Sequence, residues 1–153
     1  MEKINAENLA KDIFNWLNEH EMWIDVSIYF DGKCWSTTNK DNTDFTYNEG
    51  KYFEYDDEPT RYFEYVAENH ILSMSFEGDL YHVLNAYVPN WVKLESEFQA
   101  IFEKHGVYYE MGNAWNLTCY PIWIGKYYRT NAKLFEYWTL HKGKSFVWDW
   151  VFK

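Results

Sequence analysis

Short turn signals between segments of alternating polar and apolar residues constrain the fold of this chain more than any other feature. Residues 24–30 and 34–38 alternate in this way, and Asp31-Gly32 between them is typical of a tight β-hairpin turn. Turns this short join antiparallel strands, because parallel strands need a much longer crossover connection. The pattern therefore predicts a mostly antiparallel sheet built from hairpins.

Further segments have the composition or alternation of strands and extend this prediction along the chain. They are residues 51–55, residues 71–76, a hairpin of residues 107–111 and 115–120, and a C-terminal three-stranded meander over residues 122–129, 133–141 and 145–152. We expect all of them to join the antiparallel sheet.

Two longer segments instead place their apolar residues at helical spacing. The first helix is predicted over about residues 5–20 with Asn5 as its cap, and the second over about residues 90–105, ending before Gly106. Shorter helices are predicted to start at Pro59 and to run from Asp79, as the cap, through Tyr87. The expected fold is a single α+β domain over residues 1–153, with the two main helices packed on one face of the sheet.

The composition indicates a core built largely from aromatic rings. Phe, Trp and Tyr make up 22% of the 153 residues, with 9 Trp, 14 Tyr and 11 Phe. The only two cysteines, Cys34 and Cys119, are far apart and predict no disulfide framework. The sequence contains no apolar run of the length of a signal peptide or a membrane span, so we expect a cytoplasmic protein with reduced thiols.

Charge is distributed unevenly along the chain. Residues 1–120 contain 22 Asp and Glu against 8 Lys and Arg, a net charge of −14, whereas residues 121–153 contain two acids against six bases, a net charge of +4. Residues 41–68 alone contain nine acids against Lys51 and Arg61, a net charge of −7. Such a surface would repel free nucleic acid and anionic membranes.

The acidic segment 41–68 is also rich in aromatic residues, and it contains the tetrapeptide Tyr-Phe-Glu-Tyr twice, at residues 52–55 and 62–65. The first copy lies in a strand-like context and the second follows Pro59, so we expect the copies to present different faces. Rings provide rigid contact area and carboxylates attract basic groups, so the segment is a candidate partner-binding surface. Its candidate residues are Asp41, Asp44, Glu49, Tyr52, Glu54, Tyr55, Asp56, Asp57, Glu58, Tyr62, Glu64, Tyr65 and Glu68. The alternative is that these rings belong to the core and the acids keep an aromatic-rich protein soluble.

Motifs that carry catalysis are absent from the sequence. It contains no glycine-rich phosphate loop, nucleophile elbow, paired-cysteine motif or helix with two histidines four residues apart. The five histidines are scattered, and only the fold could bring them together. We therefore expect a protein that is not an enzyme and that binds no cofactor or metal; an active site assembled only by the fold is an alternative.

A second alternative is nucleic-acid binding by the C-terminal segment. Basic residues there, including Lys126 and Arg129, alternate with rings such as Trp123 and Tyr127, and rings beside basic groups can stack single-stranded bases. The charge of −14 on residues 1–120 opposes this function.

The favoured hypothesis is a small acidic inhibitor or interaction protein that binds a basic partner, such as a nuclease or another nucleic-acid-handling protein, by mimicking nucleic acid. In size, charge and lack of catalytic motifs the chain is similar to anti-CRISPR and antirestriction proteins of phages and mobile elements, and to the acidic immunity proteins that neutralise nuclease toxins. The likeness is one of composition, and no functional residue is transferred from it.

Overall fold

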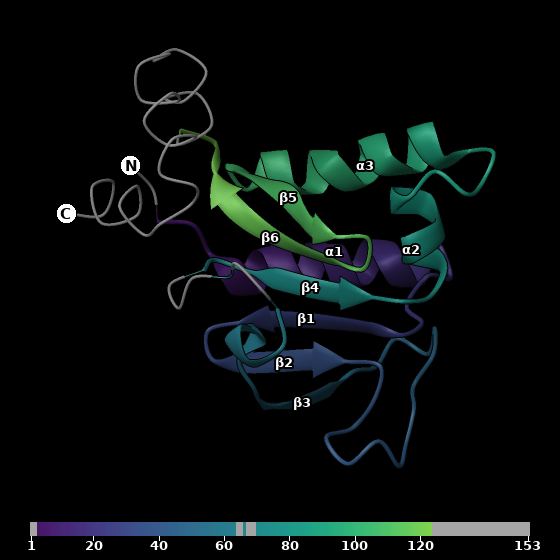
Figure 1. Ribbon diagram of the computed structural model, residues 1–153, viewed down its shortest axis with the longest axis vertical. Helices are drawn as coiled ribbons and strands as arrows, with labels where there is room; N and C mark the ends of the chain where they lie inside the picture. Colours follow the sequence, from purple (N-terminus) through teal and green to yellow (C-terminus); the bar gives the residue numbers. More distant parts are fainter. Residues whose placement is uncertain (1–2, 64–65, 67–69, 124–153) are drawn as a thin grey trace. The chain divides into compact units, whose positions relative to one another are not determined.

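A six-stranded antiparallel sheet forms the centre of the fold, with strand order β3-β2-β1-β4-β6-β5 (Figure 1). The structure, a computed structural model, describes residues 3–63, 66 and 70–123. The strands are β1 (Val26–Phe30), β2 (Lys33–Ser36), β3 (Phe53–Asp56), β4 (Ser73–Phe76), β5 (Val107–Asn113) and β6 (Asn116–Pro121). The predicted hairpins around Asp31-Gly32 and residues 112–114 are confirmed, because each forms a pair of neighbouring strands in the sheet, β1 with β2 and β5 with β6.

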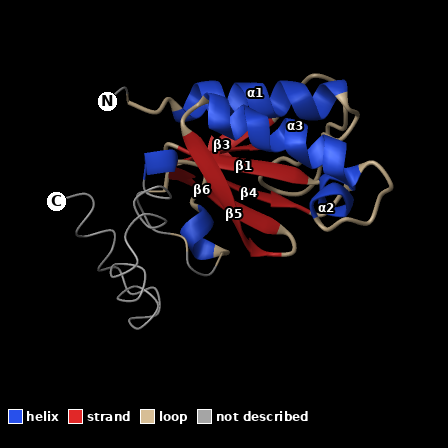
Figure 2. Ribbon diagram, turned by 90° about the horizontal axis from the view of Figure 1, so that it is seen from above, coloured by secondary structure: helices blue, strands red, loops and turns tan. Residues whose placement is uncertain are grey.

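The helices are α1 (Ala6–Glu19), α2 (Asp79–Leu84) and α3 (Trp91–Lys104), together with the 3₁₀ turn η1 (Pro59–Arg61). Figure 2 shows α1 and α3 on the same side of the sheet, as the sequence predicts. The side chain of Asn5 caps α1 by accepting a 3.0 Å hydrogen bond from the backbone N–H of Asn8. The α+β class and the two main helices are therefore confirmed.

The core between the helices and the sheet contains large aromatic side chains, as the composition indicates. Trp23, Trp35, Phe30, Phe98 and Phe102 are each at most 1% exposed. Aliphatic residues of α1 and of the central strands complete the same core, namely Leu9, Ile13, Leu17, Val26 and Ile28.

Both short helices differ from their predictions. Helix α2 is capped by Gly78 rather than Asp79, and a Cβ at Gly78 would overlap the backbone oxygen of Ile24. Helix α2 also stops at Leu84, and Ala86 beyond it has a left-handed φ of 62°, which does not continue a helix. The helix predicted to start at Pro59 forms only the turn η1, whose C-terminal cap is Tyr62.

The opposite face of the sheet carries a second, smaller apolar cluster. Tyr29, Cys34 and Phe63 are its buried members, and the partly buried Tyr55, Val66 and Trp115 pack against them. Phe63 thus attaches the segment directly after η1 to this face of the sheet by burying its ring.

The chain divides into two units, Met1–Tyr120 and Pro121–Lys153. The boundary falls where the net charge changes from −14 to +4. Ile122 and Trp123, the first residues of the predicted C-terminal meander, are helical, and the rest of that meander lies outside the described residues. The predicted single domain over residues 1–153 includes this C-terminal segment, so it stays a prediction. In the described part of the chain, none of the helices has both the length and the apolar character needed to cross a membrane.

Candidate protein-binding surface

Candidate residues on the edge strand β3 lie on opposite faces of the sheet. Side chains alternate along a strand, and the register places Glu54 opposite Trp35 and Tyr55 opposite Cys34. Glu54 therefore lies on the face that carries the helices, and Tyr55 lies on the face of the smaller cluster. The first Tyr-Phe-Glu-Tyr copy lies in and next to a strand, as predicted, but it does not present a single face.

Two candidate residues at this edge take part in the fold itself. The ring of Tyr52 stacks on Trp35, with 4.2 Å between ring centroids, and meets Phe14 edge-on at 5.1 Å. Glu54 accepts a 2.7 Å hydrogen bond from Nε1 of Trp35 and lies 3.5 Å from Nζ of Lys33. The hydrogen bond from Trp35 is the main reason that the pKa of Glu54 is lowered.

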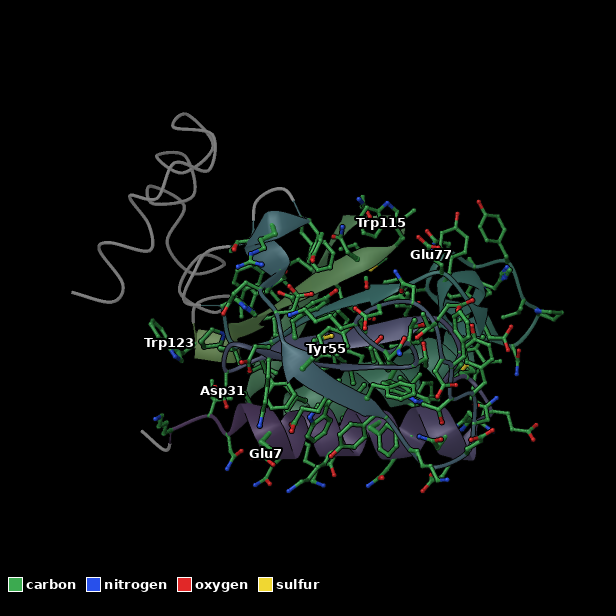
Figure 3. All side chains as sticks on the ribbon, turned by 90° about the horizontal axis from the view of Figure 1, so that it is seen from below. Glu7, Asp31, Tyr55, Glu77, Trp115 and Trp123 are labelled. Atoms are coloured by element: carbon green, nitrogen blue, oxygen red, sulfur yellow. The ribbon has the colours of Figure 1, made fainter. Side chains whose placement is uncertain are left out.

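The remaining acids lie towards opposite ends of the sheet. Asp31 and Glu77, which follow the C-terminal ends of β1 and β4, mark these two ends in Figure 3. Asp57 lies at the Asp31 end, where its backbone N–H bonds to the carbonyl of Gly32. The loop that carries Asp41, Asp44 and Glu49 joins β2 to β3 at the Glu77 end. The remaining described acids of the candidate surface are thus divided between two ends of the sheet.

At the Asp31 end, the candidate residues interact with one another and with a histidine. The hydroxyl of Tyr62 donates a 3.3 Å hydrogen bond to Asp57, and Tyr62 is 56% exposed. Glu58 lies 3.8 Å from Nε2 of His70. Asp56 is exposed at the end of β3. Glu64, Tyr65 and Glu68 lie outside the described residues.

At the Glu77 end, residues 37–52 form an ordered connection that we call the 37–52 loop. The side-chain oxygen of Asn39 accepts hydrogen bonds from the backbone N–H groups of Thr43 (2.8 Å) and Asp44 (3.1 Å). Thr38 and Phe45 form an antiparallel bridge that closes this turn. Asp41 and Asp44 are exposed on it.

The second half of the 37–52 loop is bound to the end of α1 and the residues after it. The side chain of Asn48 accepts a 2.8 Å hydrogen bond from the backbone N–H of Trp23 and donates one of 3.0 Å to the carbonyl of Glu21. The side chain of Asn18 accepts a hydrogen bond from the backbone N–H of Gly50 at 3.2 Å. These contacts join segments about 25 to 32 residues apart in the sequence.

Three rings of the 37–52 loop are exposed, and two of them, Phe45 and Tyr47, pack against each other rather than on Trp35. Phe45 is 53% exposed and Tyr47 is 39% exposed, and their ring centroids lie 5.8 Å apart. The hydroxyl of Tyr47 donates a 2.6 Å hydrogen bond to Asp25, which raises the pKa of Tyr47 to about 12. Sequence reasoning about individual residues missed Phe45, Tyr47 and Asp25, although rings within an Asn- and Asp-rich loop were a signal for exposure.

One arrangement on the sheet has the residue types of a hydrolase triad. The hydroxyl of Ser73 lies 3.2 Å from Nδ1 of His70, whose Nε2 faces Glu58. Ser73 is 0% exposed, and its hydroxyl shares a 2.9 Å hydrogen bond with that of Thr118. The Ser73 hydroxyl is therefore buried, and its hydrogen bonds join β4 to β6 and to His70.

The described part of the chain also offers neither an exposed cysteine nor a candidate metal site. Cys34 is buried, and burial raises the pKa of its thiol to about 12. Residues 3–63, 66 and 70–123 contain no group of three or more His, Cys, Asp or Glu that could hold a metal ion. The basic residues of the nucleic-acid alternative, Lys126 and Arg129, lie outside the described residues.

Comparison of the chain with protein-family models, with curated proteins and with solved structures finds no match.

Proposed function

We propose that this protein is a small acidic inhibitor or interaction protein that binds a basic protein partner, as anti-CRISPR, antirestriction and nuclease-immunity proteins do. The partner class is a nuclease or another nucleic-acid-handling protein, whose binding channel is lined with Lys and Arg. The protein acts by occupying that channel and needs no catalytic group, cofactor or metal of its own.

One observation carries the proposal: a net charge of −14 on unit Met1–Tyr120 combined with carboxylates that the fold leaves on its surface. Asp41, Asp44, Glu49 and Asp56 are exposed, and Asp57 and Glu58 are half-buried. A concentrated negative charge accelerates encounter with a basic protein and disfavours nucleic acid as the ligand.

Affinity capture at increasing salt tests the proposal. The tagged full chain is incubated with the lysate proteins that a cation exchanger retains, and bound proteins are identified by mass spectrometry. We expect a basic nucleic-acid-handling protein whose binding weakens steeply with salt, because exposed charges are screened. Two variants, one with Asp41, Asp44 and Glu49 neutralised to the amides and one with Asp56 and Asp57 neutralised, should reduce its capture.

The matched control neutralises three acids on the helices, Glu19, Glu95 and Glu103, and removes as much charge as the first variant. Equal capture by all the variants and the parent chain would contradict binding through the candidate surface. Absence of any salt-sensitive basic partner would contradict the proposed function itself.

A further inference from the structure

The connection between β2 and β3 is much longer than the topology requires. The two strands are antiparallel neighbours, and roughly two to five residues are enough to join such a pair. Sixteen residues, 37–52, separate Ser36 from Phe53. Connections of this length within a compact fold are usually functional or disordered.

The 37–52 loop belongs to the ordered kind. Asn39 holds the turn at its tip, and Asn48 ties its second half to Trp23 and Glu21. The ring of Tyr47 is held by the hydrogen bond to Asp25. Because these contacts form on folding, a partner that binds the loop does not need to order it, which removes one of the main costs of association.

Phe45 has no evident role in the core. Its ring is 53% exposed, so a large part of its apolar surface faces water at the tip of an ordered loop. Together with Tyr47 it forms an exposed aromatic pair; Asp44 precedes Phe45 in the sequence, and Asp25 accepts the hydrogen bond from Tyr47. Rings in such surroundings supply binding energy, whereas the charges around them mainly speed association.

We propose that the 37–52 loop is the principal contact with the partner: Phe45 and Tyr47 enter an apolar slot on a basic protein, and Asp25, Asp41 and Asp44 face Lys and Arg at its rim. This inference rests on the proposed function and specifies the surface that carries it. Charge complementarity commits the partner to a basic protein, because Asp25, Asp41 and Asp44 outnumber Lys40, the base next to Asp41 in the sequence, and would repel an acidic rim.

Photo-crosslinking from the loop tests the inference directly. In the full-length chain, Phe45 is replaced by p-benzoylphenylalanine, and the chain is irradiated with the basic lysate fraction. The control places the same group at Met111, which is 37% exposed on β5, at the opposite edge of the sheet. We expect an adduct from position 45 only, joined to a partner peptide that contains Lys or Arg.

Binding kinetics with that purified partner then separate the two roles. Phe45→Ala should raise the dissociation rate at least about tenfold and leave the association rate nearly unchanged. Asp41→Asn with Asp44→Asn should instead lower the association rate and flatten its salt dependence. Met111→Ala is the matched control for loss of an exposed apolar side chain. The free energy of unfolding of Phe45→Ala should equal that of the parent chain.

The outcomes distinguish this inference from the proposed function. If the parent chain captures a salt-sensitive basic protein but position 45 gives no adduct, the 37–52 loop is not the contact and the proposed function stands. The same holds if Phe45→Ala and Met111→Ala dissociate at equal rates. If the parent chain captures no basic protein at all, the proposed function and this inference both fail.

Discussion

Trp35 on β2 and Glu54 on the neighbouring edge strand β3 are joined by a 2.7 Å hydrogen bond from the indole Nε1 to the carboxylate. Trp35 is 1% exposed, so its ring belongs to the core while its polar atom reaches the edge. An acid at the centre of the repeated Tyr-Phe-Glu-Tyr sequence thus satisfies a core side chain. Removing this acid tests the fold more directly than it tests partner binding.

Glu54→Ala should lower the free energy of unfolding by about 1 kcal/mol, because it leaves the indole N–H without its acceptor. Glu54→Gln is the control, since its amide oxygen can still accept that hydrogen bond, and it should cost less. Urea denaturation of both variants gives the comparison. Equal losses for Ala and Gln would show that the hydrogen bond is not the source of the effect.

Asp12 should make stability depend on acidic pH. It joins α1 to the end of α3 through His105 (2.6 Å) and Lys104 (3.1 Å), and its pKa is lowered below 3.8, chiefly by the bond from His105. A lowered carboxyl pKa adds stability above 3.8 that is lost as pH falls through the folded-state value. Thermal unfolding between about pH 6 and pH 3 should therefore show a smaller decline for Asp12→Asn than for the parent chain. Glu7→Gln, which removes an exposed pair with Lys11 on one helix, should keep the parent's decline.

His70 should contribute a second pH dependence at higher pH. Burial lowers its pKa below 6.5, although the charges of Glu58 and Asp31 act in the opposite direction. The unfolded chain therefore takes up a proton first, and stability should fall as pH drops below 6.5 towards the folded-state pKa. Removing the imidazole in His70→Gln should reduce this fall, with His82→Gln as the control. An NMR titration that places the folded-state pKa of His70 above 6.5 would contradict the prediction.

Both cysteines should be unreactive in the folded protein. Cys34 and Cys119 are 0% and 1% exposed, and burial raises the pKa of each thiol. A thiol reagent such as an aromatic disulfide should modify them slowly under native conditions and rapidly in concentrated guanidinium chloride. One fast-reacting thiol in the native protein would show that one of the two sites opens readily. Cys34→Ser and Cys119→Ser would then identify it.

Asn48 should be the residue on which the order of the 37–52 loop depends most. Asn48→Ala removes the acceptor of the Trp23 N–H and should cost about 1–3 kcal/mol in unfolding free energy. Asn42→Ala is the matched control, because Asn42 and Asn48 have similar left-handed φ values of 55° and 53° and the same backbone cost applies. Hydrogen exchange should show faster exchange at the Trp23 amide in Asn48→Ala only. Equal exchange in both variants would indicate that the backbone, and not the side chain, orders the loop.

Local sequence signals were sufficient for much of the fold. Asp31-Gly32 forms the β1–β2 turn because both residues accept the left-handed conformation, with φ values of 49° and 75°. The apolar spacing from Leu9 to Leu17 predicts α1, since it places those residues on one buried face. The cap of α2 is predicted at Asp79 and lies at Gly78, because the feature that selects glycine there is the carbonyl of Ile24, a contact made by folding.

By itself, the sequence determined the α+β class, the antiparallel hairpins, the two main helices and the concentration of charge before Pro121, because each depends on residues near one another in the chain or on composition. Only the tertiary structure decided which acids and rings are available to a partner. Glu54 and Tyr52 contact Trp35 of the core, whereas the rings of Phe45 and Tyr47 contact each other on a loop held by Trp23 and Asp25. The exposure of a side chain depends on which residues lie against it. Strand register and long-range hydrogen bonds decide those neighbours, and the local sequence does not.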